Sequence, residues 1–351
     1  MPAETPSPRR LESVNQPPLY ADESPWPHRW AVTLVCATFP LIWIGGLVTT
    51  YKAGMAVPDW PNTYGYNLFL YPWQTWIYGP FNLFIEHGHR LFASVVGMIA
   101  ICLVISTWRS QKNPLIRWLS VVALVAVIAQ GLLGGLRVIE DEVLLAKIHA
   151  CFGPAFFALS VAVAFVTSKL WRHGPVLQRA SLDKVERYAV LTTLLAYCAL
   201  VLGSQLRHLS ATARPGDFRI ALVFHLAVAA ALLVHIMLLA VEVYRKHRGE
   251  PSLFRPAMAL ALLIAVQLGL GTGTWITKYG WPSWFGDYQF AATYTVVADS
   301  RAQAWITTAH VATGSLILAT SFLVALRSVR YAWRAPRAAE APKSWLVEVA
   351  R

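Results

Sequence analysis

The stretch FNLFIEHGHRLFASVVGMIAI, residues 81–101, begins with several ionisable side chains and continues as an apolar run. The apolar part extends to about residue 107, and a helix of about 20 such residues is long enough to cross a bilayer. Ionisable groups are costly inside a membrane, so those that a chain keeps there usually mark a site. The stretch therefore predicts a transmembrane helix with a functional group of side chains at its start.

The whole chain has the composition of an integral membrane protein. Of its 351 residues, 56% are hydrophobic and only 14% are charged, and the mean hydropathy is +0.47. Soluble domains carry about 25% charged residues. We expect an all-α integral membrane protein whose eight transmembrane helices cover roughly residues 30–50, 86–107, 116–136, 144–167, 187–206, 219–243, 256–275 and 304–326.

The net charge of +12 follows the expected topology and is not gathered into a nucleic-acid footprint. Of the 30 lysines and arginines, 21 lie in the two tails and in alternate loops, and the other nine lie on the opposite side. Cytoplasmic loops of membrane proteins carry such an excess of positive charge. We therefore expect a multi-pass protein of the cell (inner) membrane with both termini cytoplasmic and no nucleic-acid partner.

Polar segments divide the chain into two helical halves. Residues 1–29 are polar and rich in proline and lack the apolar core of a signal peptide, so we expect a disordered cytoplasmic tail. The segments that follow are an N-terminal four-helix half (30–168), a cytoplasmic linker (169–186), a C-terminal four-helix half (187–326) and a basic cytoplasmic tail (327–351).

The halves resemble each other as parallel repeats. QGLLGGLR at 130–137 is matched by QLGLGTGTW at 267–275, and His149-x-x-x-Gly153 is matched by His310-x-x-x-Gly314. Glycine-rich helix ends are common in membranes because they allow close packing, so coincidence is the alternative. The matched histidines favour two repeated four-helix bundles.

Four of the ten histidines share one position in their helices. Each lies within the first two turns of an even-numbered predicted helix, and each of these helices starts at the outer face; they are His89, His149, His225 and His310. The others have ordinary interpretations: His28, His173, His208 and His247 are expected in solvent, and His235 is expected to be a core histidine bonded to a carbonyl. The four cysteines, all within predicted helices and without a CxxC pair, are expected to be small core residues: Cys36, Cys102, Cys151 and Cys198.

Haem explains the four histidines most simply. Two imidazoles from facing helices hold one iron axially, and small residues nearby let the flat macrocycle approach the backbone. A zinc-type site would need more ligands at one point than the sequence offers. We expect two haem sites, one formed by His89 with His149 and one by His225 with His310. Structural histidines, or the proton path of a transporter, are the alternatives.

The two halves differ beside their first histidine. Glu86 precedes His89 by three residues and Arg90 follows it, so all three share one flank of a helix. A buried glutamate beside a haem would be a proton acceptor, although a purely structural ion pair is the alternative. His87 is expected to point elsewhere. At the matching positions around His225, the second half has only leucines, Leu222 and Leu226. A haem in such apolar surroundings is suited to electron transfer.

Two long outer loops, residues 51–85 and 276–303, are rich in tryptophan and tyrosine. An interfacial aromatic belt explains most of these side chains. Loops of this length are often functional, and a lid over an outward-facing pocket is the functional interpretation.

Several motifs together resemble those of the haem A synthases that serve cytochrome c oxidase assembly. They are AGMAVPDWPNTYGY at 53–66, Glu86-x-x-His89-Arg90, QGLLGGLRV and the helix-borne His149, within a layout that covers about residues 30–326. The resemblance implies oxidation of the C8 methyl of haem O to a formyl group. It also implies that the first site takes the substrate haem with Glu86 as the catalytic residue and Arg90 as an accessory, and that His225 and His310 hold a haem B cofactor. The partners expected are the lipid bilayer, a haem O synthase (farnesyltransferase) and an electron acceptor; association into a homo-oligomer is left open.

The sequence departs from this pattern in its outer loops. Many relatives carry a cysteine pair there, whereas residues 62–64 read Asn-Thr-Tyr and the loop has no cysteine. Where many members have an arginine after the Gly-Gly of the first helix, this chain reads GGLVTTYK, so a contact to a haem propionate is expected at Lys52 or elsewhere. A dihaem b-type electron carrier or quinol oxidoreductase is the alternative function.

Overall fold

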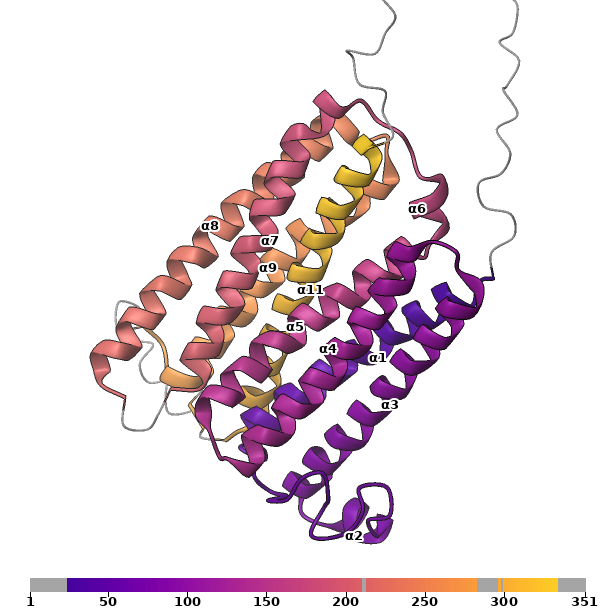
Figure 1. Cartoon of the computed structure of the whole chain (residues 1–351). Helices are drawn as coiled ribbons and strands as arrows, with labels where there is room; N and C mark the ends of the chain where they lie inside the picture. Colours follow the sequence, from indigo (N-terminus) through magenta and orange to yellow (C-terminus); the bar gives the residue numbers. More distant parts are fainter. Residues whose placement is uncertain (1–23, 210–212, 283–295, 298, 334–351) are drawn as a thin grey trace, which may run out of the picture.

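The computed structural model describes residues 24–209, 213–282, 296–297 and 299–333. In these ranges it is helical, with one isolated bridge between Thr63 and Tyr66 and no strand (Figure 1). Eight helices are long and apolar enough to cross a membrane, which confirms the predicted all-α class. They are α1 (Trp26–Thr50), α3 (Phe81–Ser110), α4 (Pro114–Ile139), α5 (Val143–Val166), α7 (Arg179–Arg207), α8 (Pro215–His247), α9 (Pro251–Tyr279) and α11 (Arg301–Trp333), with the short α2 (Trp73–Tyr78) and α6 (Lys169–His173) between them.

The helices extend further than the apolar runs that predicted them. Proline occupies the first turn of α4, α8 and α9, where its missing N–H is not needed. Asn113 caps α4 by accepting a hydrogen bond from the backbone of Leu115. Such polar turns lie outside the hydropathy windows, so the sequence locates the apolar middle of each helix better than its ends.

The long helices form two groups that contact each other along one seam. In the first group α1 packs on α3, α3 on α4 and α4 on α5; in the second α7 packs on α8, α8 on α9, and α11 on both α7 and α9. The seam is made mainly by α1 and α5 against α11, as the indigo, magenta and yellow ribbons in Figure 1 show. This arrangement is compatible with the predicted repeat.

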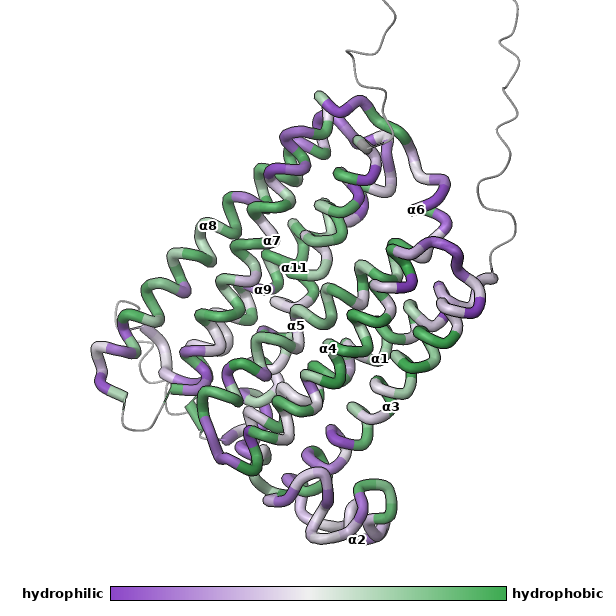
Figure 2. The backbone as a smooth tube through the Cα atoms, viewed as in Figure 1, coloured by the Kyte–Doolittle hydropathy of each residue, from purple (hydrophilic) through white to green (hydrophobic). Residues whose placement is uncertain are grey.

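Apolar side chains fill the interior and also cover the outside. The two larger buried clusters centre on Leu34, Leu103 and Phe156 in the first half and on Leu182 and Leu260 in the second, and the latter extends to Phe157 of α5. Large apolar side chains remain exposed along the outward faces, where lipid replaces water as the solvent. Figure 2 shows this as green along the middle of the bundle and purple toward its ends.

Two predictions about ordinary residues were wrong. All four cysteines are free as expected, but Cys36 and Cys198 are exposed on the helix surface and are not core residues. His28 and His247 are not solvated. The Nδ1 of His28 lies 3.1 Å from the carbonyl oxygen of Ala164, and the Nε2 of the buried His247 lies 3.0 Å from that of Ser181. These two histidines bind neighbouring helices together. The Nδ1 of His235 bonds to the Ala231 carbonyl of its own helix, as expected.

Candidate active site

Each of the four histidines stands against a glycine of a neighbouring helix. A Cβ added to Gly45 of α1 would lie 2.9 Å from Cε1 of His89, and one added to Gly134 of α4 would lie 2.9 Å from Cε1 of His149. Real Cβ atoms do not approach other atoms so closely. Only glycine therefore lets these two imidazoles lie directly on the backbone of the neighbouring helix.

The second half repeats this arrangement with slightly more space. A Cβ on Gly203 of α7 would lie 3.3 Å from Cε1 of His225, and one on Gly271 of α9 would lie 3.1 Å from Cε1 of His310. The glycines of α4 and α9 were visible as matched motifs. Those of α1 and α7 were missed, because a single glycine in a membrane helix has many explanations.

Backbone carbonyls orient one histidine of each pair. The Nδ1 of His149 lies 3.2 Å from the carbonyl oxygen of Gln130, and the Nδ1 of His225 lies 3.1 Å from that of Ala199. With the proton on Nδ1 donated to the carbonyl, Nε2 keeps its lone pair for a metal, which is the arrangement usual for metal-binding histidines.

The histidines of the second pair face each other. The ring centroids of His225 and His310 are 6.4 Å apart, at an interplanar angle of 67°. Two imidazoles on opposite sides of one metal, with metal–nitrogen bonds of about 2 Å, have centroids roughly 6 Å apart. The Nδ1 of His310 is buried and has no hydrogen-bond partner within the described ranges. The spacing suits a single iron between the two rings.

A cavity of about 380 Å³ lies in the first half, and both histidines of the first pair line it. Its size falls in the range of ligand pockets. Glu86 and Arg90 lie on the same wall as His89, which confirms that these three side chains share one flank of their helix. Small residues form much of the remaining wall, as a flat ligand requires: Gly45, Gly46, Ala93, Ser94, Gly131, Gly134, Ala150 and Gly153.

Glu86 and Arg90 form an ion pair that also holds the first outer loop. The Nη2 of Arg90 lies 2.7 Å from Oε1 of Glu86, and the glutamate side chain is only 3% exposed. The other carboxylate oxygen of Glu86 accepts a hydrogen bond of 2.9 Å from the Val57 backbone. Arg90 donates to three carbonyl oxygens of the loop, those of Val57, Asp59 and Asn62. The ion pair of Glu86 and Arg90 therefore has the structural role that was the alternative, and both residues also line the cavity.

The loop held in this way covers the cavity as a lid. Trp60 and Pro61 line the cavity, and the indole of Trp60 packs directly on the backbone of α4 at Gly135. A tight turn follows, in which Tyr64 and Gly65 have positive φ angles of 49° and 80°. The carboxylate of Asp59 accepts hydrogen bonds of 2.8 Å from both of their N–H groups. Residues 57–65 are called the lid below, after the functional interpretation of the loop; Trp60 and Pro61 are the two of them that line the cavity.

The charge of Asp59 is fixed by this turn. Burial alone would raise the pKa of Asp59, but the backbone N–H groups of Gly65 and Tyr64 and the charge of Arg90 outweigh it. The pKa therefore lies below the usual value. His87, which the sequence left unexplained, supports the lid from below: it is 2% exposed and lies 3.0 Å through Nδ1 from Oγ1 of Thr63. It does not line the cavity, in agreement with its predicted peripheral place.

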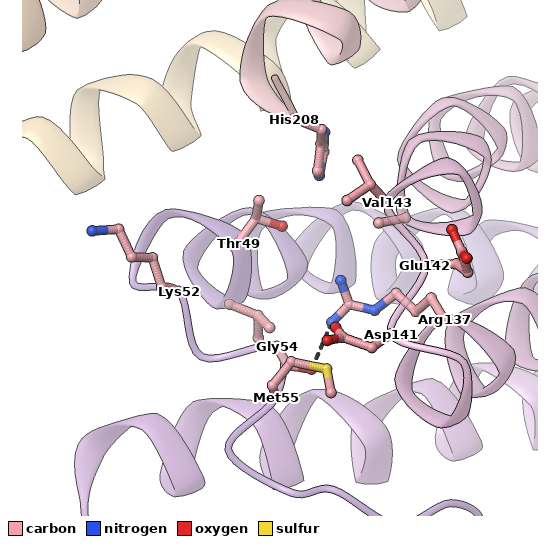
Figure 3. A pocket seen from close by; sticks show the side chains of 11 residues that line it. Thr49, Lys52, Gly54, Met55, Arg137, Asp141, Glu142, Val143 and His208 are labelled. Carbon is pink, nitrogen blue, oxygen red and sulfur yellow. Dashed lines mark hydrogen bonds between the residues drawn. The ribbon is translucent and has the colours of Figure 1, made fainter. Parts of the chain in front are cut away.

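Two arginines on the cavity wall were missed from the sequence. Arg137 in the last turn of α4 donates to the Gly54 carbonyl oxygen at 3.1 Å, the dashed line in Figure 3. Arg207 at the end of α7 donates to the Gly46 carbonyl and to Oγ1 of Thr50, both at 2.6 Å. Arg207 belongs to the second half of the chain and lines the cavity of the first. An arginine at a helix end reads as an ordinary cap in sequence, so neither residue gave a distinct signal.

Of the places left open for a contact to a haem propionate, Lys52 does not line the main cavity. Its side chain is 78% exposed and forms an ion pair of 3.3 Å with Asp299. It lines only a smaller recess of about 200 Å³ outside the main cavity. Figure 3 shows this recess, with Asp141 and Glu142 among the residues that line it.

His208 was expected in solvent and instead lines both the recess and the main cavity. Burial lowers the pKa of His208, against the opposing effect of a hydrogen bond to the Ser204 carbonyl. The charges of Arg207 and Arg137 lower it further. His208 is therefore neutral near pH 7 and adds no charge to the wall.

The sites are built from pairs rather than clusters of ligands. Within the described part of the chain, no group of three or more histidine, cysteine, aspartate or glutamate side chains is placed to hold a metal ion. Two paired imidazoles with glycine at their backs fit the flat, axially bound iron of haem better than a bare ion.

Comparison with known proteins agrees with this geometry. The sequence matches the cytochrome oxidase assembly protein family (COX15-CtaA) over residues 28–220. The chain belongs to the haem A synthase family. It is 28% identical over 255 residues to the heme A synthase of Shouchella clausii, an alignment that covers 66% of this chain and 81% of the relative.

Other haem A synthases align over similar lengths. The heme A synthase of Halalkalibacterium halodurans is 26% identical over 255 residues, with 66% of this chain and 81% of the relative covered. That of Geobacillus kaustophilus is 24% identical over 268 residues, with 69% and 80% covered. Family membership places the chain among membrane oxidoreductases. The family match includes Glu86, His89 and His149 and ends before His225.

Proposed function

We propose that this protein oxidises the C8 methyl of haem O to the formyl group of haem A. Two successive hydroxylations each take an oxygen atom from water and release two protons and two electrons, and the resulting gem-diol loses water. The observation that carries the proposal is the composition of one cavity wall. His89 and His149 line the same cavity, and the buried carboxylate of Glu86 lies beside them. A ligand pair with a proton acceptor is what oxidation of a substrate haem requires.

In this proposal the substrate haem is bound through its iron by His89 and His149. The Gln130 carbonyl orients His149, and Gly45 and Gly134 leave room for both rings. In the second half, His225 and His310 would hold a haem B, which supplies one-electron transfer when bound. The 6.4 Å between their ring centroids supports that pairing.

Glu86 is the proposed proton acceptor, and its contacts suit that role. Arg90 and the Val57 backbone fix both carboxylate oxygens at the cavity wall. When Glu86 takes a proton it loses its charge, yet Arg90 keeps its three loop carbonyls as partners. The lid therefore stays fastened through the proton transfer, and Trp60 stays on the cavity wall.

The same proposal places the protein in its cellular setting. The helices lie in the inner cell membrane with both termini cytoplasmic, because the basic loops alternate with the long outer ones. Residues 30–168 form the substrate half and residues 187–326 the electron-transfer half. A haem O synthase would deliver the lipophilic substrate, a separate acceptor would take the electrons, and copies of this chain would associate.

The mass of the haems extracted from the protein tests the reaction. We expect protein produced with a supply of haem O to yield hydroxylated and formyl haems together with haem B. A dihaem electron carrier would yield haem B alone, and that result would contradict the proposed activity. A transporter would be colourless.

A further inference from the structure

The cavity wall carries more positive than negative charge. Three guanidinium groups line it, those of Arg90, Arg137 and Arg207, against one carboxylate, that of Glu86. The pair of Glu86 with Arg90 cancels one charge of each sign. The excess of two positive charges resides on Arg137 and Arg207.

Neither of these two arginines forms an ion pair with a carboxylate in the described part of the chain. Asp141 lies near Arg137 in the outer recess, but it is exposed and the two side chains are not paired. Arg137 and Arg207 each bond to the protein through Nη2. An arginine has five N–H donors in a planar fork, so each keeps donors for another partner.

A charge held away from water without a counter-charge is unfavourable. A wall with two such charges is therefore complementary to a ligand with two negative groups. Carboxylates match the guanidinium fork with two parallel hydrogen bonds. Haem carries two carboxylates on one edge, its propionates, and is otherwise largely apolar.

We propose that Arg137 and Arg207 bind the two propionates of the substrate haem and thereby set which methyl is presented to Glu86. The proposal rests on the proposed function, in which haem O enters this cavity. Both arginines are positioning residues, since they act on the edge of the substrate and not on the reacting carbon.

The position of the two arginines in the bundle gives the substrate a direction. Arg137 and Arg207 end their helices at the same end of the bundle at which α3 begins with Glu86. Val127, ten residues before Arg137 on α4 and so about 15 Å deeper, lines the apolar end of the cavity with Leu41 and Phe156.

In haem O the C8 methyl shares a pyrrole ring with one propionate, whereas the farnesyl tail is attached to a neighbouring ring away from the propionates. Propionates at the arginines therefore bring this methyl to the same end as Glu86. The tail then extends toward the apolar end. Because Arg207 comes from α7, the substrate site of the first half is complete only with a residue of the second.

A structural role is the competing explanation. Arg207 bonds the last turn of α1, and Arg137 bonds the start of the loop. Replacing either would then weaken the binding of any ligand equally. A haem whose carboxylates are esterified separates the two explanations. If the arginines contact the propionates, the ester binds more weakly than the natural substrate; if their role is structural, both ligands bind alike.

The test is a titration of the purified full-length protein in lipid nanodiscs with ferric haem O and with its dimethyl ester, followed by absorbance and tryptophan quenching. We expect the wild type to bind the diacid roughly 10- to 100-fold more tightly than the ester, because two charge-assisted interactions are lost in the ester. Arg137→Gln and Arg207→Gln should each reduce this preference to a few-fold, and the double variant should abolish it. Arg207→Lys should retain part of it.

Arg214→Gln is the matched control. Arg214 is an exposed cation at the start of α8, paired with Asp217 outside the cavity, and its replacement should leave the preference unchanged. The proposal is overturned if the wild type binds diacid and ester equally, or if the glutamine variants weaken both ligands by the same factor. The comparison of diacid with ester on the wild-type protein tests the proposal even if a variant does not fold.

The same samples separate this proposal from the proposed reaction. If the protein shows an arginine-dependent preference for the diacid but forms no haem A, the propionate site is supported and the proposed reaction is contradicted. If haem A forms normally but the preference for the diacid is absent, the proposed reaction is supported and the propionate site is contradicted. A mixture of formyl isomers from Arg207→Gln would support the positioning role directly.

Discussion

The imidazole of His89 lies so close to Gly45 that a Cβ on this glycine would come within 2.9 Å of its Cε1. The contact crosses from α3 to α1, and both residues line the cavity. Gly45→Ala should therefore push the ring away from its position and weaken the binding of ferric haem O roughly tenfold or more, as measured by titration. The helix itself loses nothing, since alanine is the better helix former.

Gly97→Ala on α3 is the control for this change. A Cβ at Gly97 meets nothing within 4 Å, so we expect wild-type haem binding and equal or slightly higher thermal stability. Equal losses in both variants would mean that His89 does not depend on the glycine.

Replacement of Glu86 separates its contact with the loop from its proposed role as proton acceptor. Glu86→Gln keeps a side-chain oxygen for the Val57 N–H and leaves the loop carbonyls on Arg90, so the lid should remain closed and haem should still bind. Loss of the proton acceptor should slow formation of oxidised haem by roughly 10²-fold or more. Extracted haems measured by mass over time give this rate. Normal product formation with Gln would leave Glu86 with the structural duty only.

The second pair predicts a spectroscopic result. His310→Ala should remove the haem B proposed for the second half, or convert its spectrum from low-spin to high-spin, because only His225 would remain as a ligand. Absorbance of the purified protein shows this directly. His235→Ala is the control on α8, since His235 bonds only to its own helix at Ala231. An unchanged bis-imidazole spectrum in His310→Ala would show that His225 and His310 do not bind the same iron.

The lid should open at low pH. The pKa of Asp59 lies below its usual value of about 3.9. A lowered carboxylate pKa gives stability that is fully present above the usual value and is lost as the pH falls through the lowered one. Hydrogen exchange at the N–H groups of Tyr64 and Gly65 should therefore show constant protection from pH 5 upward and lose it below about pH 4.

Asp59→Asn should show faster exchange at these two amides at every pH, by roughly tenfold for a lost charge-assisted bond. Protection that is independent of both pH and this substitution would show that the carboxylate does not hold the turn.

The sequence located the eight helices because the bilayer demands a long apolar run for each, and it placed the four histidines because the repeat set them in matching turns. It misjudged His28 and His247, since a backbone carbonyl from another helix satisfies each of them. Such partners depend on how helices pack and leave no mark in the local sequence.

The cations of the cavity were harder still to find. Lys52 lies two residues beyond the end of the first helix in the sequence, whereas Arg207 lies 157 positions beyond Thr50 and still bonds to it. Arg207 lies next to the first helix only because the two halves of the bundle pack against each other. The aromatic lid was inferred from loop length, but its attachment to Arg90 and Glu86 required the fold.

Arg90 fastens the lid through main-chain oxygens alone, at Val57, Asp59 and Asn62. Because every residue type offers the same carbonyl, the exposed side chain of Asn62 is free to change while the loop stays held, whereas the side chain of Val57 is fully buried and is constrained by its packing. Asp59 and Trp60 carry duties of their own. Substitutions at exposed positions of the lid can therefore change access to the cavity, while the hydrogen bonds from Arg90 to the lid backbone are kept.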